Sequence, residues 1–296
     1  MINTVSLNKK NRDRILLFLI LIVPVFILRF ATAAYPIKNT IYLSLTDLHL
    51  IDGTHNFVGL KNYNILLNHY NFQNAFTFTL FFVGSSTVLE IILGLLIGLM
   101  LNASFRGRYL ARTINLIPWA IPTIVAAYAF RWILDDQFGM FSPLILQWMG
   151  ENPGILNSAW GAKLSTILVN VWKNAPFMGI IFLAGLQGVP DELYEAAKVD
   201  GANVWHRFWK ITLPFLTPLV ITMGMYLVVW QLASFDLVYG FTSGGPGVAT
   251  NVLSFYIFQE GFLFFKFGYA SAVSMILLFI VALVGMIGIY LFRRYE

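Results

Sequence analysis

The chain lacks cysteine and is poor in charged residues. Cysteine is absent from all 296 residues, which excludes disulfide bonds, thiolate metal sites and thiol catalysis. Asp, Glu, Lys and Arg make up only 11% of the chain, whereas a soluble domain carries about 25%. Hydrophobic residues make up 58%, so the composition is typical of a membrane protein.

Sequence patterns of catalysis, metal binding and nucleotide binding are missing as well. The chain contains no G-x-x-x-x-G-K-S/T phosphate loop, no nucleophile elbow and no Ser/His/Asp grouping. Its four histidines form no familiar metal motif and lie outside the long apolar stretches. We therefore predict that the chain is not an enzyme and binds no metal or cofactor of its own.

Six apolar stretches are long enough to cross a bilayer, for which about 20 residues are needed. They cover residues 15–37, 75–101, 113–134, 162–186, 215–239 and 267–292. The sequence thus predicts an all-α, polytopic membrane protein with six transmembrane helices.

Pro118 and Pro122 would interrupt the hydrogen bonds of the third helix, so we expect that helix to be bent. The first stretch imitates a signal peptide, but Arg29 disfavours cleavage and we expect a retained helix.

Lysine and arginine are concentrated on one side of these stretches. Four precede the first stretch, three lie between the second and third, three between the fourth and fifth, and two follow the last. These positions hold twelve of the 19 basic residues, so the positive-inside rule places both termini and segment 190–214 in the cytoplasm. The same distribution accounts for the net charge of +5 without a nucleic-acid partner.

Segment 190–214 is a charged interruption between two apolar stretches. Asp191 and Glu192 follow Pro190, where the dipole of a helix favours negative charge. Gly201 lies where a helix would end, and Asn203 can cap a second helix. The pattern predicts two short helices joined at a glycine. From these signals alone, a solvated helical hairpin without a partner remains an alternative.

The same segment resembles the cytoplasmic EAA loop of ABC-importer permeases. The matching residues are Glu195-Ala196-Ala197, Asp200-Gly201-Ala202, Phe208 and Leu213-Pro214. The resemblance implies a type I ABC-importer permease fold whose loop docks, as a coupling helix, into a cleft of a separate ATPase subunit. Glu195 would make a polar contact with that cleft, while Ala196 and Ala197 would allow close approach. Asp200 and Gly201 would set the turn, and Phe208 would anchor the second short helix.

Other segments resemble the carbohydrate class of these permeases, similar to the maltose, glycerol-phosphate and multiple-sugar permeases. They are Phe57-Val58-Gly59-Leu60 with Asn62-Tyr63, Trp172 and Pro176 with residues 183–187, and Thr242-Ser243-Gly244-Gly245-Pro246 with Thr250. The resemblance implies a multi-pass protein of the bacterial cytoplasmic (inner) membrane that pairs with a second, different permease. It also implies two ATPase subunits, which bind ATP and Mg, and an extracytoplasmic solute-binding protein. Gly244, Gly245 and Pro246 would contact that binding protein or form part of the outer gate.

Polar residues inside the predicted spans are candidates for a substrate site. Transporters place substrates near the midplane at interrupted helices, and sugar pockets combine aromatic rings with hydrogen-bonding groups. The candidates are Glu90, Asn170, Lys173, Asn174, Tyr226, Trp230, Gln231 and Asp236. Two structural alternatives to a substrate site stay open. Lys173 could pair with Glu90 or Asp236 and hold helices together. The polar and aromatic residues of the fifth span, which includes Ser234, could serve only helix packing.

We expect residues 1–74 to hold a tail, the first helix and the first external loop, residues 75–292 to form the permease domain, and residues 293–296 to form a cytoplasmic tail. A short interfacial helix is expected near residues 142–149.

The predicted function is ATP-driven import of a carbohydrate, in particular an oligosaccharide. The alternatives are an ion-coupled secondary transporter, with Glu90, Lys173 and Asp236 as a proton relay, and a permease for glycerol phosphate or an acidic sugar.

Overall fold

The computed structural model describes residues 3–140, 143 and 154–295, and most of these residues are helical. Its helices are α1 (Asn3–Ser44), α2 (Lys61–Asn68), α3 (Tyr70–Asn102), α4 (Arg108–Asn115), α5 (Ile117–Ala120), α6 (Thr123–Ile133), η1 (Ile155–Asn157), α8 (Ala159–Leu186), α9 (Asp191–Val199), α10 (Val204–Arg207), η2 (Phe208–Thr212), α11 (Leu213–Leu232), α12 (Asp236–Phe241), α13 (Leu253–Phe258), η3 (Gln259–Leu263) and α14 (Phe267–Tyr295). Two isolated β-bridges, in the loop between α1 and α2, are the only strand-like pairings in these described residues. The interfacial helix expected near residues 142–149 lies outside them, apart from residue 143.

The six predicted spans are present as five long apolar helices and one broken span. The long helices are α1, α3, α8, α14 and the continuous run Val204–Leu232, which comprises α10, η2 and α11. The broken span joins Arg108–Ala120 to Thr123–Ile133 at an angle of 86°. The break falls at Ile121 and Pro122, because the residue before a proline prefers an extended backbone. The predicted all-α fold and the bend in the third span are therefore confirmed.

The fifth span ends earlier than predicted. The apolar stretch 215–239 suggested one helix, but α11 ends at Leu232 and α12 begins separately at Asp236. Ser234 and Asp236 therefore lie outside the fifth span, in and after a turn in which Ser234 N–H donates to the carbonyl of Gln231 at 3.0 Å. Hydropathy did not reveal the break because apolar residues continue on both sides of it. The carboxylate of Asp236 stands in the first turn of α12, where the helix dipole favours it.

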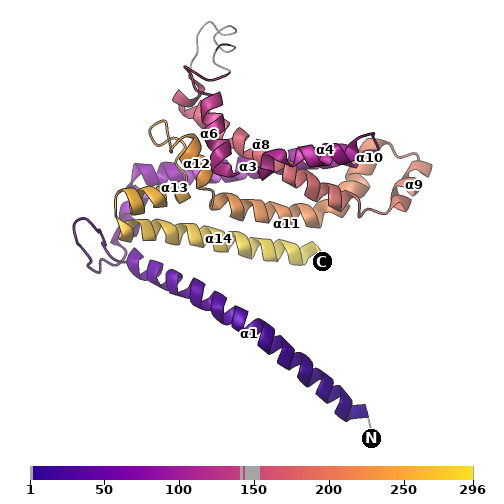
Figure 1. The fold of residues 1–296 in the computed structure, drawn as a ribbon, viewed down its shortest axis with the longest axis horizontal. Helices are drawn as coiled ribbons and strands as arrows, with labels where there is room; N and C mark the ends of the chain where they lie inside the picture. The colour runs from indigo at the N-terminus through magenta and orange to yellow at the C-terminus, as the bar shows by residue number, and fades with distance from the viewer. Residues whose placement is uncertain (1–2, 141–142, 144–153, 296) are drawn as a thin grey trace.

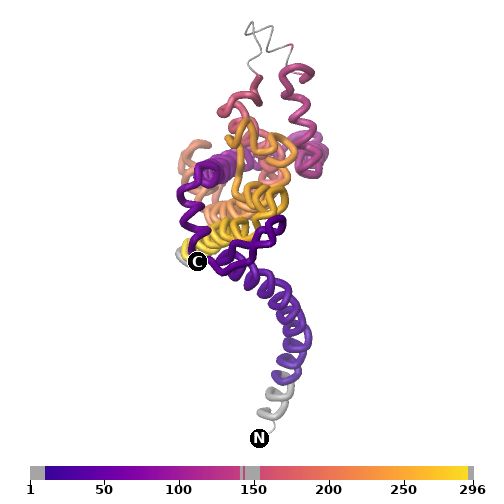
Figure 2. The backbone as a smooth tube through the Cα atoms, turned by 90° about the vertical axis from the view of Figure 1, so that its left-hand side faces the viewer, coloured from indigo at the N-terminus to yellow at the C-terminus, as the bar shows by residue number. Residues whose placement is uncertain are grey.

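The long helices run side by side, and segment 190–214 protrudes from one end of the bundle (Figure 1). The C-terminal end of α14 and the N-terminal half of α1 point towards this end, while α13 and the loop after α1 lie at the other. Helix α1 touches α14 near its own C-terminal end and then diverges from the bundle in both views (Figure 2). Most of its apolar side chains between Asn11 and Ser44 are exposed.

The closest helix contact in the bundle joins α3 and α8. A Cβ atom added at Gly94 would lie 2.5 Å from Cβ of Met178, and one added at Gly179 would lie 2.4 Å from Cγ2 of Ile97. Small residues of this kind let two membrane helices approach closely. At this contact Met178 and Phe182 of α8 pack with Leu227 of α11, while the main buried cluster joins side chains of α3, α6, α8, α11, α12 and α13.

This packing predicts opposite outcomes for two glycines of α3. Gly94→Ala should lower the free energy of unfolding of the full-length chain in detergent by about 1–3 kcal/mol, because the new methyl group would overlap Met178. Gly84→Ala is the matched control, since nothing lies within 4 Å of its added Cβ and alanine favours a helix. Chemical unfolding followed by circular dichroism measures both variants. Equal stabilities would contradict the close α3–α8 contact.

Candidate functional site

Segment 190–214 forms the two short helices that the sequence predicted. Helix α9 ends before Gly201, whose φ of +76° is the left-handed conformation that favours glycine. The side chain of Asn203 then accepts a hydrogen bond from His206 N–H at 2.7 Å and caps α10. The hydroxyls of Tyr194 and Thr212 lie 2.9 Å apart and join α9 to η2. The hairpin is thus built by local capping and one side-chain contact.

The residues that resemble the EAA loop differ in how they meet the bundle. Glu195, Ala196 and Asp200 are exposed on the outer surface, and Ala197 is half-buried. Phe208 stacks on Trp205, with ring centroids 6.2 Å apart, and faces an apolar cavity of about 770 Å³ between the hairpin and α3. Helix α9 is therefore free to meet another molecule, whereas Phe208 packs inward.

A buried polar cluster joins α3, α8 and α11 in the middle of the bundle. Oε1 of Glu90 accepts hydrogen bonds from Nδ2 of Asn170 at 2.9 Å and from Nδ2 of Asn174 at 3.4 Å. Oε2 of Glu90 accepts a hydrogen bond from Nε2 of Gln231 at 3.0 Å. Four of the candidate residues from three helices are thus brought together around one carboxylate.

Beside this cluster lies a cavity of about 260 Å³. It is lined by Trp119, Thr123, Asn170, Lys173, Asn174, Trp230, Ala233, Ser234, Phe235 and Asp236. Lys173 is only 8% exposed, and its Nζ donates to the carbonyl of Trp119 at 3.2 Å. Among the residues that the structure describes, no carboxylate forms an ion pair with Lys173. The expected alternative, in which Lys173 pairs with Glu90 or Asp236, is therefore wrong for this structure.

The other candidates lie behind or beside this cavity. Glu90 and Gln231 are buried behind its wall and do not line it. Tyr226 stacks on Trp230, with centroids 5.9 Å apart, but lines a separate apolar hollow between α11 and α14. Sequence reasoning missed Trp119, whose carbonyl binds Lys173. The proline pair carried a signal for it, because a helix break frees the carbonyls that precede it.

The loop of Gly244, Gly245 and Pro246 is a tight turn held by a threonine. Gly244 has a φ of +81°, and its carbonyl accepts a hydrogen bond from Thr250 N–H at 3.1 Å. The Thr250 hydroxyl donates to the carbonyl of Gly245 at 2.7 Å. A side chain at Gly244 would press on the ring of Phe255 at 2.9 Å. The glycine is therefore needed for the turn itself.

A polar hollow of about 230 Å³ borders this turn. Gly245 and Pro246 line it together with Arg131 and Asp135, among others. The backbone N–H groups of Phe138 and Gln137 donate to the carboxylate of Asp135 and lower the pKa of that group. The turn therefore adjoins a charged surface that is open to another molecule.

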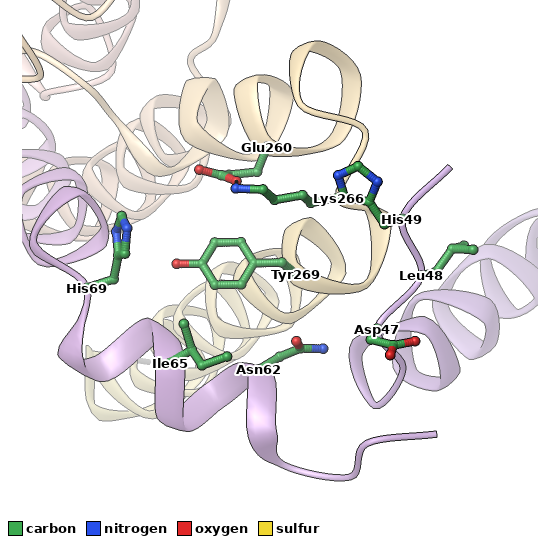
Figure 3. A pocket seen from close by; sticks show the side chains of 9 residues that line it. All are labelled: Asp47, Leu48, His49, Asn62, Ile65, His69, Glu260, Lys266 and Tyr269. Atoms are coloured by element: carbon green, nitrogen blue, oxygen red, sulfur yellow. Dashed lines mark ion pairs between the residues drawn. The ribbon is translucent and has the colours of Figure 1, made fainter. Parts of the chain in front are cut away.

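A further cavity of about 270 Å³ lies at the end of the bundle opposite α9 (Figure 3). It is lined by Asp47, Leu48, His49, Asn62, Ile65, His69, Glu260, Lys266 and Tyr269. Nζ of Lys266 lies 3.4 Å from Oε2 of the buried Glu260. The backbone N–H of Asn56 donates to Asp47 and lowers the pKa of that carboxyl. The N–H groups of Leu50 and Gly268 donate to the carbonyls of Phe265 and Leu48, at 3.1 and 3.0 Å, and join the loop after α1 to the region of η3 and α14, so the residues around the cavity have a structural role.

Comparisons with known proteins agree with this geometry. The chain belongs to the family of binding-protein-dependent transport system inner membrane components, whose model matches residues 90–296. It is 37% identical over 283 residues to the trehalose/maltose transport system permease protein MalF of Thermococcus litoralis, covering 95% of this chain and 94% of that protein. It is 33% identical to the sulfoquinovosyl glycerol transport system permease protein SmoG of Agrobacterium fabrum, covering 88% and 85%.

A solved structure shares the fold. This is the crystal structure of a bacterial alginate ABC transporter in complex with an alginate pentasaccharide-bound periplasmic protein. One of its chains matches with a TM-score of 0.83 and 22% identity over 96% of both chains. The predicted permease fold is thereby confirmed, and the chain is a multi-pass inner-membrane permease of an ABC transporter.

The inward packing of Phe208 predicts a local change in the hairpin. Phe208→Ala should remove the ring contacts to Trp205 and Trp209, loosen the hairpin and speed trypsin cleavage after Lys198 and Lys210 in the purified, detergent-solubilised chain. Val199→Ala is the control, because the side chain of Val199 is 88% exposed and packs on little. Mass spectrometry of timed digests identifies the fragments. Identical digestion rates for both variants would show that Phe208 does not anchor the hairpin.

Proposed function

We propose that this permease imports a carbohydrate, in particular an oligosaccharide, with ATP hydrolysed by separate subunits. The 260 Å³ cavity carries the proposal, because it combines rings of Trp119 and Trp230 with the hydrogen-bonding groups of Lys173, Asn174 and Asp236. Apolar faces of a sugar stack on such rings, and its hydroxyls bind such polar groups. The names of the relatives, which refer to trehalose, maltose and sulfoquinovosyl glycerol, support the same class of cargo.

The proposed assembly contains this chain, a second and different permease, two ATPase subunits that bind ATP and Mg, and an extracytoplasmic binding protein. Segment 190–214 and both termini face the cytoplasm, as the basic residues suggest. Glu195, Ala196, Ala197, Asp200 and Gly201 meet the ATPase cleft, and Phe208 holds the loop to the bundle. Gly244, Gly245 and Pro246 face the binding protein or the outer gate. Residues 75–292 act as the permease domain, between the N-terminal segment 1–74 and the tail 293–296.

The connection between the hairpin and the cavity supports this division of roles. In the chain, segment 190–214 connects α8, which carries Lys173 and Asn174, to α11, which carries Trp230. A displacement of the hairpin by the ATPase subunits therefore moves two walls of the cavity at once. In alternating access, a transporter switches between an outward-facing and an inward-facing state. A movement of the cavity walls links this switch to the cargo when the two states bind the cargo with different affinity.

An acidic sugar is a second candidate cargo. The observation that favours it is Lys173, a buried cation whose one described hydrogen bond goes to a backbone carbonyl. An ammonium group at this depth is costly unless an anion or a water-filled cavity accompanies it. A carboxylate on the cargo would supply that anion. No observation favours the proton relay, because Glu90 is surrounded by amides and not by Lys173 or Asp236.

The cargo class is tested with the assembled complex in proteoliposomes. We expect ATP hydrolysis to rise several-fold when the binding protein is loaded with a neutral oligosaccharide, because cargo delivery favours the ATP-hydrolysing state. An acidic-sugar response that Lys173→Met abolishes would instead support the second candidate. A flat response to all sugars would reject the carbohydrate assignment. Uptake driven by a proton gradient without ATPase subunits would reject the ABC mechanism.

The coupling role of the hairpin is tested at Gly201. Gly201→Asp should leave the chain in the membrane but uncouple ATP hydrolysis from uptake, because a charged side chain would face the ATPase cleft. Nothing in the chain lies within 4 Å of an added Cβ, so the chain itself has room for the side chain. Gly201→Asn is the matched control, since asparagine also tolerates the left-handed backbone and differs only in charge. Normal coupled transport by Gly201→Asp would refute the role.

A further inference from the structure

Glu90 occupies a position in the bundle that differs from that of a cargo-binding residue. Its side chain is completely buried on α3, and it does not line the cavity. Both carboxylate oxygens are occupied, by amide groups of Asn170, Asn174 and Gln231. A sugar hydroxyl in the cavity therefore meets the amides and not the carboxylate.

The carboxylate determines how these amides are oriented. All three amides turn their NH₂ groups towards the oxygens of Glu90 and their carbonyls away from it. Nδ2 of Asn174 also donates to Oδ1 of Asn170 at 3.1 Å, which fixes both side chains in one arrangement. Asn174 lines the cavity, and no described group donates to its carbonyl oxygen. That oxygen is left to accept a hydrogen bond from a bound molecule.

The same contacts link the two helices that continue into the hairpin. Asn170 and Asn174 belong to α8, which precedes segment 190–214, and Gln231 belongs to α11, which follows it. These two helices touch each other only sparsely, and each packs more extensively on α3. Glu90 on α3 therefore provides a polar tie between them at the level of the cavity. Loss of the carboxylate would leave three amides without their common acceptor.

We propose that Glu90 is a positioning residue for transport, which orients the cavity amides of α8 and ties α8 to α11, and which does not touch the cargo. The proposal rests on the proposed function of a sugar-importing permease. It replaces the sequence-based expectation that Glu90 belongs to the cargo-binding residues themselves. The affinity of the cavity for the cargo would then depend on one carboxylate, and so would the transmission of hairpin movement to the cavity.

The first test compares Glu90→Gln with Ser86→Ala in the assembled complex with its binding protein. In Glu90→Gln the new side-chain amide would present an NH₂ group to at least one amide NH₂, so sugar uptake should fall by about tenfold, the factor for leaving one buried donor unpaired. ATP hydrolysed per sugar imported should rise. Ser86 is a matched control, because it is buried one turn away on α3 and its hydroxyl has no hydrogen-bond partner among the described residues. Uptake by Glu90→Gln equal to that of Ser86→Ala would overturn the proposal.

A second variant separates positioning from simple stabilisation. The double variant Glu90→Gln with Gln231→Glu keeps one buried carboxylate paired with one amide between α3 and α11. It removes the carboxylate from Asn170 and Asn174. We expect the complex to regain wild-type thermal stability while uptake stays reduced. Full recovery of uptake would show that any buried pair suffices, and it would overturn the positioning role. A failure of the proposed function is visible separately, as a wild-type complex that responds to no sugar.

Discussion

The close contact between α3 and α8 is the constraint on which the other features depend. In a membrane, helices gain little from hiding apolar surface from one another, so small residues and polar contacts determine which helices associate. Gly94 and Gly179 bring the two backbones together. One turn before Gly94, the same approach places Glu90 against Asn170 and Asn174. The polar residues of α8 are consequently turned into the bundle, where they form one wall of a cavity.

This arrangement explains how a hairpin at one end of the molecule can affect a cavity near its middle. Helix α8 leads into segment 190–214 and α11 follows from it, so a displacement of the hairpin would act on both helices. Phe208 faces the cavity between the hairpin and α3, while Glu195 and Ala196 on α9 remain exposed. One short segment therefore combines an exposed helix with an aromatic side chain that faces the transmembrane helices.

Sequence patterns predicted most of the backbone but few of the side-chain partners. Apolar length located the six spans, and Pro122 located the break in the third, because both signals are local. The end of α11 at Leu232 was missed, since apolar residues continue through the turn. The sequence also left open whether Lys173 pairs with Glu90 or Asp236, and its hydrogen bond goes to the carbonyl of Trp119 instead. Which residues meet across helices depends on how each helix is rotated, and the amphipathic signal that would report this rotation is weak in helices surrounded by lipid and protein.

The cavity proposed for the cargo is lined by two side chains of opposite charge. Lys173 and Asp236 line the same cavity, yet neither forms an ion pair with a described residue. A neutral sugar placed between them can accept a hydrogen bond from the ammonium group and donate one to the carboxylate, so that both charges are solvated by a single ligand. An acidic sugar would be attracted more strongly by Lys173 than a neutral one, but its acid group would be repelled by Asp236. Its acid group would therefore point towards Lys173 on α8. The choice between the two cargo classes thus depends on which of these two charges the bound sugar approaches.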